Sequence, residues 1–323
     1  MALSEFELIK RYFYQSARAF GVNMGVGDDC ALLSAPENKL LAVSMDTLVG
    51  GIHFPRNADP ELIAERALRV NLSDLAAMAA EPLWFTLGLT LPSVDERWLE
   101  GFAKGLFTVA DEFNIALVGG DTTRGPLAIT IQVHGAVEAE HALMRSNARV
   151  GDVVYVTGNL GDAAAALAVI RQELTVGKSA FSYFMSHYYR PLPRIKDAKL
   201  LRDISTCGID VSDGLLADLG HICEESGVGA KIDIERVPVS TALNKVATAE
   251  QIADWALAGG DDYQLCFTVP QARLAKIEQL ISSGKLHATA IGEIVKGSEV
   301  VCYIEGEVFE PKRRGYSHFD GAN

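Results

Sequence analysis

Six short acidic turns carry the side chains in this sequence that are best suited to chemistry. Each places one or two aspartates beside Gly, Ser or Thr, and most follow an apolar stretch that predicts a strand. They are GDD at 27–29, SMDT at 44–47, NLSD at 71–74, GGDTTRG at 119–125, DVSDG at 210–214 and GGDD at 259–262. Any one of them is most simply a turn, because Asp and Gly are ordinary turn residues. Together they indicate a shared site, since loops at strand ends are where α/β proteins bind ligands.

Carboxylates gathered in one cleft repel one another unless cations lie between them. Mg²⁺ fits this need, because it prefers hard oxygen ligands and shares them with substrate phosphates. We therefore expect at least one of the adjacent Asp28 and Asp29 to point at a metal. Asp74 lies in a helical pattern on one face with Asn71 and Met78. A carboxylate on such an apolar face needs a partner.

The signatures of common phosphate-binding loops are missing. GKS occurs at 177–179, but Gln172 stands where a P-loop requires Gly. No G-x-G-x-x-G precedes a helix. The turn VGGDTTRG, with Arg124, and the turn TGNLGD, which opens a helix at residue 162, are weak candidates for anion binding at backbone N–H groups. Phosphate charge would therefore have to be met by metal ions and a few arginines.

No pair of nucleophile and general base is recognisable. The seven histidines are dispersed, and there is no G-x-S-x-G elbow. His134 and His221 are expected to be structural strand and helix residues. His53, in GGIHFP, is as readily functional as structural.

Composition excludes several classes of protein. A net charge of −13 without a basic stripe disfavours nucleic-acid binding. The apolar runs are too short to span a membrane, and the N-terminus lacks the basic-then-apolar order of a signal peptide, so we expect a cytoplasmic protein. Five scattered cysteines without a C-x-x-C pair indicate reduced thiols, with Cys266 and Cys302 in strand cores.

Helices and strands alternate through both halves, so we expect an α/β or α+β protein of two domains, 1–140 and 141–323. Asp59 and Pro60 are typical of a helix start. In the first half the pattern predicts helices at 4–17, 59–80 and 95–114, strands at 40–49, 84–92 and 127–137, and a strand at 115–123 that runs into a glycine turn. In the second half it predicts strand, turn and helix over 151–170 and again over 205–227, further strands within 255–269 and 299–311, and a helix at 271–284.

Eight motifs, in order and spacing, resemble the thiamine-monophosphate kinase family nearly end to end. They are GVGDDCALL, SMDTLVGGIHF, VNLSDLAAMAAEP, LVGGDTTRGP, LMRSNARVGD, IDVSDGLLADLGHI, GGDDYQLCFTV and the terminal RGYSHF. The family belongs to a superfamily of ATP-using enzymes that includes aminoimidazole ribonucleotide synthetase. The resemblance implies an N-terminal domain, 1–140, that binds ATP and magnesium and whose strands join a barrel across a homodimer. It also implies a C-terminal α/β domain, 141–323, with ATP and Mg²⁺ in the cleft between the domains.

The resemblance also implies roles for individual residues. Several Mg²⁺ ions would be held by Asp29, Ser44, Asp46, Asp74, Asp121, Asp210 and Asp213. ATP would contact Gly120, Asp121, Arg145 and Ser212, and thiamine monophosphate would contact His53, Asp261 and Tyr316. No residue is expected to act as a general base.

Two departures from the family pattern affect these roles. The family usually has S-T-D-T where this chain has SMDT, so position 45 can offer a metal only the backbone carbonyl of Met45. It usually has G-G-E-D-Y-E where this chain has GGDDYQ. Asp261 is therefore one methylene shorter than Glu, and Gln264 removes a charge.

The implied reaction is direct transfer of a phosphoryl group from ATP to thiamine monophosphate, without a phosphoenzyme. The acceptor phosphate is already ionised near neutral pH, so metal ions and in-line positioning would carry the catalysis. Three alternatives stay open: another ATP-using synthetase of the superfamily, a non-catalytic magnesium–nucleotide module, and a metal-dependent phosphatase. The short N-terminal helix, with no Cys before Cys30, disfavours the synthetases.

Overall fold

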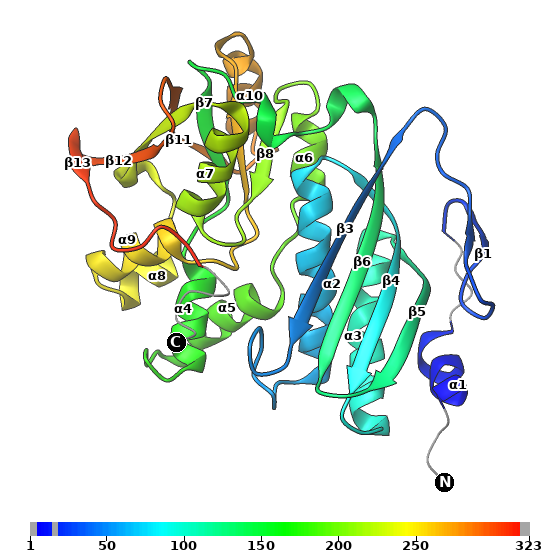
Figure 1. The fold of residues 1–323 in the computed structure, drawn as a ribbon. Coiled ribbons are helices and arrows are strands. Elements are labelled where there is room, and N and C mark those ends of the chain that lie inside the picture. Colours follow the sequence, from blue (N-terminus) through cyan, green and yellow to red (C-terminus); the bar gives the residue numbers. More distant parts are fainter. Residues whose placement is uncertain (1–4, 15–18, 317–323) are drawn as a thin grey trace. The chain divides into compact units, whose positions relative to one another are not determined.

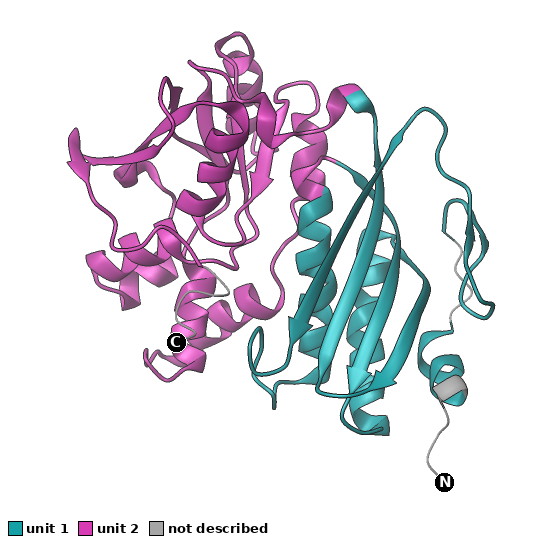
Figure 2. Ribbon diagram, in the orientation of Figure 1, with its two compact units in different colours: residues 1–75, 80–139 teal, residues 76–79, 140–323 magenta. Residues whose placement is uncertain are grey.

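The computed structural model describes residues 5–14 and 19–316 and divides the chain into two compact units (Figures 1 and 2). Unit 1 consists of residues 1–75 and 80–139, and unit 2 of residues 76–79 and 140–323. Within the described ranges, no helix has both the length and the apolar character needed to cross a bilayer. The mixed α/β character predicted from the sequence is confirmed, with helices and sheets in both units.

Unit 1 is a four-stranded sheet with two long helices on one face (Figure 1). The strand order is β3-β6-β4-β5, and only the β4–β5 pair is parallel. The elements are α1 (Glu5–Leu8), a π-helical turn (Ile9–Phe13), β1 (Val22–Met24), β2 (Leu32–Leu33), β3 (Leu40–Val49), α2 (Pro60–Ala77), β4 (Glu81–Leu91), α3 (Glu96–Phe113), β5 (Ala116–Arg124) and β6 (Ala128–Val137).

The two long helices begin where the sequence predicts. Asp59 Oδ1 accepts the N–H of Glu61 (2.8 Å) ahead of α2, and Pro60 is its first residue. Asp95 Oδ1 accepts the N–H groups of Arg97 and Trp98 (2.9 and 3.2 Å) at the start of α3. The apolar faces of the helices cover one face of the sheet, where Phe85, Ile131 and Val133 are fully buried.

Two expected elements of unit 1 differ in the structure. The strand expected at 115–123 does not end in a turn: β5 continues through Gly119 and Gly120 to Arg124, and the register shift between Phe85 and Thr86 leaves Val118 as the extra residue ahead of the glycines. The helix expected at 4–17 is described only over 5–14, where α1 passes into the π-helical turn. Residues 15–18 lie outside the described residues, as do Ser317, His318 and Phe319 of the terminal motif.

Unit 2 is built on a seven-stranded sheet of order β13-β12-β9-β11-β7-β10-β8, in which only β12 and β9 are parallel. The longer elements are β7 (Val153–Thr157), α4 (Asp162–Ile170), α5 (Lys178–Tyr189), α6 (Ile195–Leu201), β8 (Cys207–Asp210), α7 (Leu215–Ser226), β9 (Gly229–Asp233), α8 (Thr241–Val246), α9 (Ala249–Ala258), β10 (Leu265–Val269), α10 (Leu274–Ser282), β11 (Ala288–Val295), β12 (Val300–Ile304) and β13 (Glu307–Phe309). Short 3₁₀ turns occupy Ala139–His141, Arg145–Asn147, Ile234–Arg236 and Gln271–Arg273.

Alternate residues of the central strands pack into two separate hydrophobic cores in unit 2. Val154 and Val156 of β7 pack in one cluster with α7, and Tyr155 between them packs in the other with α6 and α10. Cys266 and Cys302 are buried in strands, as predicted, and all five cysteines are free. The strand expected within 255–269 begins only at Leu265, because Trp255–Ala258 closes α9.

The barrel expected for the N-terminal domain is not closed within one chain. The four-stranded sheet of unit 1 is open, and β3 and β5 are its two edges. The residues of β3 on the face opposite the helices include Leu41, Val43 and Met45, with 47%, 53% and 60% of their surface exposed.

Candidate active site

Four predicted or neighbouring polar residues meet between β3 and α2 in unit 1. Ser44 Oγ donates a hydrogen bond to Asp74 Oδ2 (2.6 Å), and the backbone N–H of Asp46 donates to Asn71 Oδ1 (3.1 Å). Asn71 is itself held by a bond from its Nδ2 to the carbonyl of Ala67 (2.9 Å). Asp74 was predicted to need a polar partner, and that partner is Ser44. The structure brings Ser44, Asp46 and Asp74 together.

Asp121 lies on the other side of the same sheet. Asp46 is in register with Ile131, Leu87 and Gly120, a row whose apolar members are buried under the helices. Asp121 is one residue further along β5, in register with Gly88, and its side chain therefore points to the opposite face. Three strand spacings, about 14 Å, separate the two edge strands. One copy of unit 1 does not bring Asp121 to Asp46 and Asp74.

Gly120 occupies a position that only glycine fits. Its φ is +156°, and a Cβ there would approach the carbonyl oxygen of Leu87 to 2.0 Å. Asp121 is thus held inside a strand, paired with Gly88, and not in a turn. The expectation that the acidic motifs sit beyond strand ends is wrong for Asp46 and Asp121, which lie within β3 and β5.

The remaining predicted residues of unit 1 lie in two tight turns. Asp28 Oδ1 accepts the N–H of Asp29 (2.8 Å), and both side chains are exposed, so water screens their repulsion. His53 Nδ1 accepts the N–H of Val49 (2.9 Å) in the turn after β3. That bond requires Nδ1 to be unprotonated, which leaves the proton of a neutral His53 on Nε2.

In unit 2, the turn after β8 is the most highly bonded candidate element. Asp210 ends β8 and is buried, whereas Ser212 and Asp213 are partly exposed. Oδ2 of Asp218, in the first turn of α7, accepts the N–H groups of Ser212, Asp213 and Gly214 at 3.0, 3.1 and 3.1 Å. Burial, together with the nearby Asp210 and Asp213 carboxylates, raises the pKa of Asp218 to about 8.

The carbonyl groups of the same turn hold two predicted substrate residues. The N–H of Asp261 donates to Ser212 O (2.8 Å), and the N–H of Tyr316 donates to Asp213 O (2.9 Å). Ser212, Asp213, Asp261 and Tyr316 therefore come together in unit 2. Tyr316 is half exposed, so its ring is accessible.

A buried carboxylate anchors the turn that carries Asp261. Asp262 accepts the N–H groups of Gly161 (2.7 Å) and Ala163 (3.3 Å) at the start of α4, and burial raises its pKa. The residues on either side of it are strained: φ is +70° at Asp261 and +49° at Tyr263. Tyr263 also donates its hydroxyl to Asp261 Oδ1 (3.0 Å). The anion-binding position suggested by TGNLGD is consequently filled by a side chain of the protein.

Gln264, which stands where the family usually has Glu, does not lie at the surface of the site. It is buried, and its Oε1 accepts bonds from Arg194 Nε (2.7 Å) and Thr157 Oγ1 (3.0 Å). Its Nε2 donates to the carbonyl of Asp262 (3.2 Å), a bond that an ionised Glu cannot make. Gln264 thus supports the Asp261 turn from beneath.

The tail that carries Tyr316 is tied to α9. Arg313 binds Asp254 through two nitrogens, with Nε to Oδ1 and Nη2 to Oδ2 both at 2.9 Å, and Lys312 pairs with Glu250. Arg145, a predicted ATP contact, is exposed and lies in a 3₁₀ turn. Its backbone carbonyl accepts the hydroxyl of Ser226 (2.7 Å).

Sequence reasoning missed Asp162, whose buried carboxyl joins three helices. Its oxygens accept the hydroxyl groups of Ser240 (2.6 Å) and Tyr183 (2.8 Å), and burial raises its pKa. Burial and Asp162 together raise the pKa of Tyr183 to about 12. These bonds tie α4 to α5 and to the start of α8.

The expected structural histidines differ from each other. His134 lies in β6, and burial lowers its pKa, so it is a neutral strand residue. His221 lies on an exposed position of α7. Both positions agree with the strand and helix assignments of the sequence.

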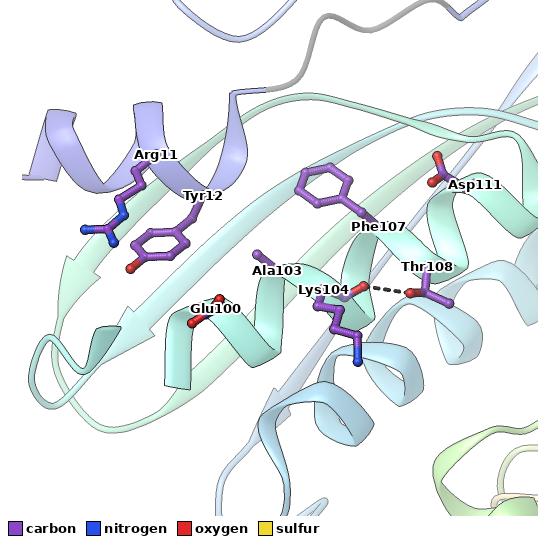
Figure 3. A pocket seen from close by; sticks show the side chains of 8 residues that line it. All are labelled: Arg11, Tyr12, Glu100, Ala103, Lys104, Phe107, Thr108 and Asp111. Carbon is purple, nitrogen blue, oxygen red and sulfur yellow. Dashed lines mark hydrogen bonds between the residues drawn. The ribbon is translucent and has the colours of Figure 1, made fainter. Parts of the chain in front are cut away.

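A cavity in unit 1 lies away from every predicted residue (Figure 3). It has a volume of about 540 Å³ between the π-helical turn, which contributes Arg11 and Tyr12, and α3, where Lys104 O accepts the hydroxyl of Thr108 (2.8 Å). Its charged side chains are already paired in part, Arg11 with Glu96 and Lys104 with Glu61. Among the residues that the structure describes, no three His, Cys, Asp or Glu side chains lie close enough to hold a metal without other ligands.

Both units match family models, and full-length relatives are known. Models described as AIR synthase related protein match residues 27–137 with their N-terminal domain and 149–305 with their C-terminal domain. Thiamine-monophosphate kinase of Escherichia coli (strain K12) is 47% identical over 99% of each chain. The crystal structure of thiamine-monophosphate kinase from Stenotrophomonas maltophilia K279a has 42% identity and a TM-score of 0.86, covering 96% of this chain and 99% of that one. AaThiL complexed with AMPPCP and TMP has 30% identity and a TM-score of 0.77 over 99% of each chain.

Proposed function

Because this chain belongs to the thiamine-monophosphate kinase family, we propose that it transfers the γ-phosphoryl group of ATP to thiamine monophosphate, giving ADP and thiamine diphosphate. The observation that carries the proposal is full-length identity of 47% to a curated kinase of that name. A related structure was solved with AMPPCP and TMP, an ATP analogue and the acceptor substrate. The use of ATP points to the cytoplasm as the place of action.

Several Mg²⁺ ions are proposed to hold the phosphates. The meeting of Ser44, Asp46 and Asp74 supplies hard oxygen donors in one place, which is the chemistry that Mg²⁺ requires. Asp29, Asp121, Asp210 and Asp213 complete the proposed set. Too few acids meet within the described residues to hold a metal alone, so water and phosphate oxygens would fill the remaining positions, as is usual for Mg²⁺.

The transfer is proposed to be direct and in line, without a general base. The acceptor oxygen belongs to a phosphate whose second pKa is about 6, so it is ionised near neutral pH. The difficulty is to bring two anions together, which bound Mg²⁺ relieves by neutralising charge. The chain's own part is to place the acceptor and the nucleotide, ATP against Gly120, Asp121, Arg145 and Ser212.

Thiamine monophosphate is proposed to contact His53, Asp261 and Tyr316. The half-exposed ring of Tyr316 offers a face to the thiazolium cation. Asp261 offers a carboxylate to the same cation, and its Oδ1 is already oriented by Tyr263. Its shorter reach than Glu leaves room for a bridging water. His53, with its proton on Nε2, offers a hydrogen-bond donor.

Two copies of the chain are proposed to form a homodimer through β3. This edge strand is ten residues long and exposes Leu41, Val43 and Met45, a combination that proteins normally cover. Pairing with a second four-stranded sheet would close the edges into a barrel. The position of Asp121 across the sheet from Asp46 supports a site completed by a second copy.

A coupled assay of ADP release tests the function. ADP should form with thiamine monophosphate and not with thiamine or unrelated phosphate esters, at an equal yield of thiamine diphosphate. ATP binding without turnover would support a non-catalytic module, and release of phosphate from thiamine monophosphate without ATP would support a phosphatase. Trapping of the labelled γ-phosphoryl group on the protein would refute direct transfer.

A further inference from the structure

Asp218 has three backbone donors on one carboxylate oxygen. It is 2% exposed, and its Oδ2 accepts the N–H groups of Ser212, Asp213 and Gly214 within a range of 3.0–3.1 Å. Three successive N–H groups converge on one point only when the backbone curves around it. The carboxylate and the curvature of this turn therefore depend on each other.

This turn lies beyond the end of β8, so the sheet does not fix it. The last sheet-like contacts are made by Val211, whose N–H donates to Gln264 O (2.7 Å) and whose carbonyl accepts the N–H of Tyr263 (2.8 Å). Gly214 has a φ of +116°, and a Cβ there would come within 2.9–3.1 Å of the backbone of Ala258. The turn thus fits tightly against α9 but has no ladder partner over 212–214.

The carbonyl groups of Ser212 and Asp213 hold other elements, whereas that of Gly214 accepts the N–H of Asp218 (3.0 Å). Ser212 O accepts the N–H of Asp261, and Asp213 O accepts the N–H of Tyr316. Ser212 and Asp213 are candidates for nucleotide and metal binding. This three-residue turn consequently connects them to Asp261 and Tyr316, which are candidates for substrate binding.

We propose that Asp218 is a positioning residue that holds the nucleotide side and the acceptor side of the active site in one arrangement. It does so without touching either substrate, by fixing the turn from which Ser212 and Asp213 project and to which the Asp261 and Tyr316 segments are bonded. The inference rests on the proposed function, in which those four residues contact the substrates. The N–H groups of this turn are already bonded, so a phosphate here must be met by the Ser212 hydroxyl and by a cation at Asp213.

Amide hydrogen exchange tests the structural half of this proposal without any activity. Asp218→Ala leaves three backbone donors without their acceptor, so exchange of the 212–214 amides should accelerate about tenfold or more. Asp218→Asn keeps one acceptor oxygen and should fall between Asp218→Ala and the native protein. Ile222→Ala is the matched control, since Ile222 is fully buried one turn further along α7 and makes none of these bonds. It should lower the melting temperature without selective exchange at 212–214.

Steady-state kinetics test the functional half. Asp218→Ala should raise KM for both ATP and thiamine monophosphate, with a fall in kcat/KM of about a hundredfold, because displacement of the turn misplaces both substrates. Asp218→Asn should recover most of that loss, and Ile222→Ala should leave both KM values unchanged.

Three results would overturn the proposal: native exchange at 212–214 in Asp218→Ala, an equal rise of KM in Ile222→Ala, or a rise of KM for one substrate only. Should Asp218→Ala fail to fold, native exchange at 212–214 in Asp218→Asn would overturn it. If native protein makes no thiamine diphosphate, the proposed function fails while the exchange result stands on its own.

Discussion

Replacement of Asp74 by Asn is the sharpest test of the proposed magnesium site. The change removes one negative charge and keeps the shape of the side chain and an oxygen that can accept the hydroxyl of Ser44. The fold should therefore be retained. In the absence of magnesium the variant should be as stable as the native protein or slightly more so, because one carboxylate near Asp46 is gone.

The expected magnitude follows from binding linkage. A ligand present at 100 times its Kd stabilises the protein that binds it by about 2.7 kcal/mol. If the loss of one carboxylate weakens magnesium binding by about 10-fold to 100-fold, a range seen for perturbed metal sites, that stabilisation falls to about 1.4 or about 0.4 kcal/mol at the same magnesium concentration. Since about 1 kcal/mol shifts the melting temperature of a protein of this size by roughly 2–4 °C, the lost shift is several degrees.

Two measurements across one magnesium titration check this prediction. Thermal unfolding should show a native-like melting temperature without magnesium and a reduced gain with it. The ADP-coupled assay should show the half-saturating magnesium concentration rising by about 10-fold to 100-fold.

Glu61→Gln provides the matched control for these experiments. It removes one charge from the same helix about 20 Å away, where Glu61 pairs with Lys104 (2.8 Å). It should change neither titration. An unchanged magnesium midpoint and rate in Asp74→Asn would exclude Asp74 from the metal set and refute the reasoning.

Three further predictions concern assembly, positioning and packing. Val43→Lys should convert the proposed dimer to a monomer in light scattering, because it charges the exposed face of β3, whereas His221→Lys on α7 should not; a monomeric native chain would contradict this. Arg313→Lys should raise KM for thiamine monophosphate roughly threefold to tenfold with little change in kcat, since the bidentate bond to Asp254 tethers the Tyr316 tail, and an unchanged KM would argue against the tether. Gly105→Ala should destabilise the fold by about 1–3 kcal/mol in denaturant unfolding, because the added Cβ would lie 2.2 Å from the carbonyl oxygen of Glu61, whereas Gly220→Ala, with open space around it, should stabilise by up to about 1 kcal/mol.

Much of the fold was predictable because its signals are local. Asp59, Pro60 and Asp95 mark the starts of α2 and α3, and the strands predicted at 40–49 and 127–137 match β3 and β6. The glycines at 119 and 120 were misread as a turn, because their role depends on β4. They pair with Thr86 and Leu87 of β4 after a bulge at Val118, and no pattern within 115–125 shows that neighbour.

The residues of the candidate site could be predicted from the sequence, but the hydrogen bonds between them could not. Asp218 lies among Leu215, Leu219 and Ile222 of α7, so it needs a polar partner for the same reason as Asp74. The signal for Asp218 was therefore present in the sequence. The partner of Asp262 was not readable, because Gly161 is 101 residues away along the chain and the bond is made by backbone N–H groups, which every sequence contains.

The two turns of unit 2 that would ordinarily attract phosphate are satisfied by the protein itself. Asp262 is bonded to Gly161 and Ala163 at the start of α4, and Asp218 is bonded to the turn before α7. With those N–H groups committed, backbone binding of the kind that P-loops use is not available there. A chain of net charge −13 that handles two phosphorylated substrates must then recruit cations, and its aspartates are the ligands with which it can do so. The absence of a P-loop and the abundance of acidic motifs thus agree with the proposed function, in which buried aspartates hold the turns and magnesium binds the phosphates.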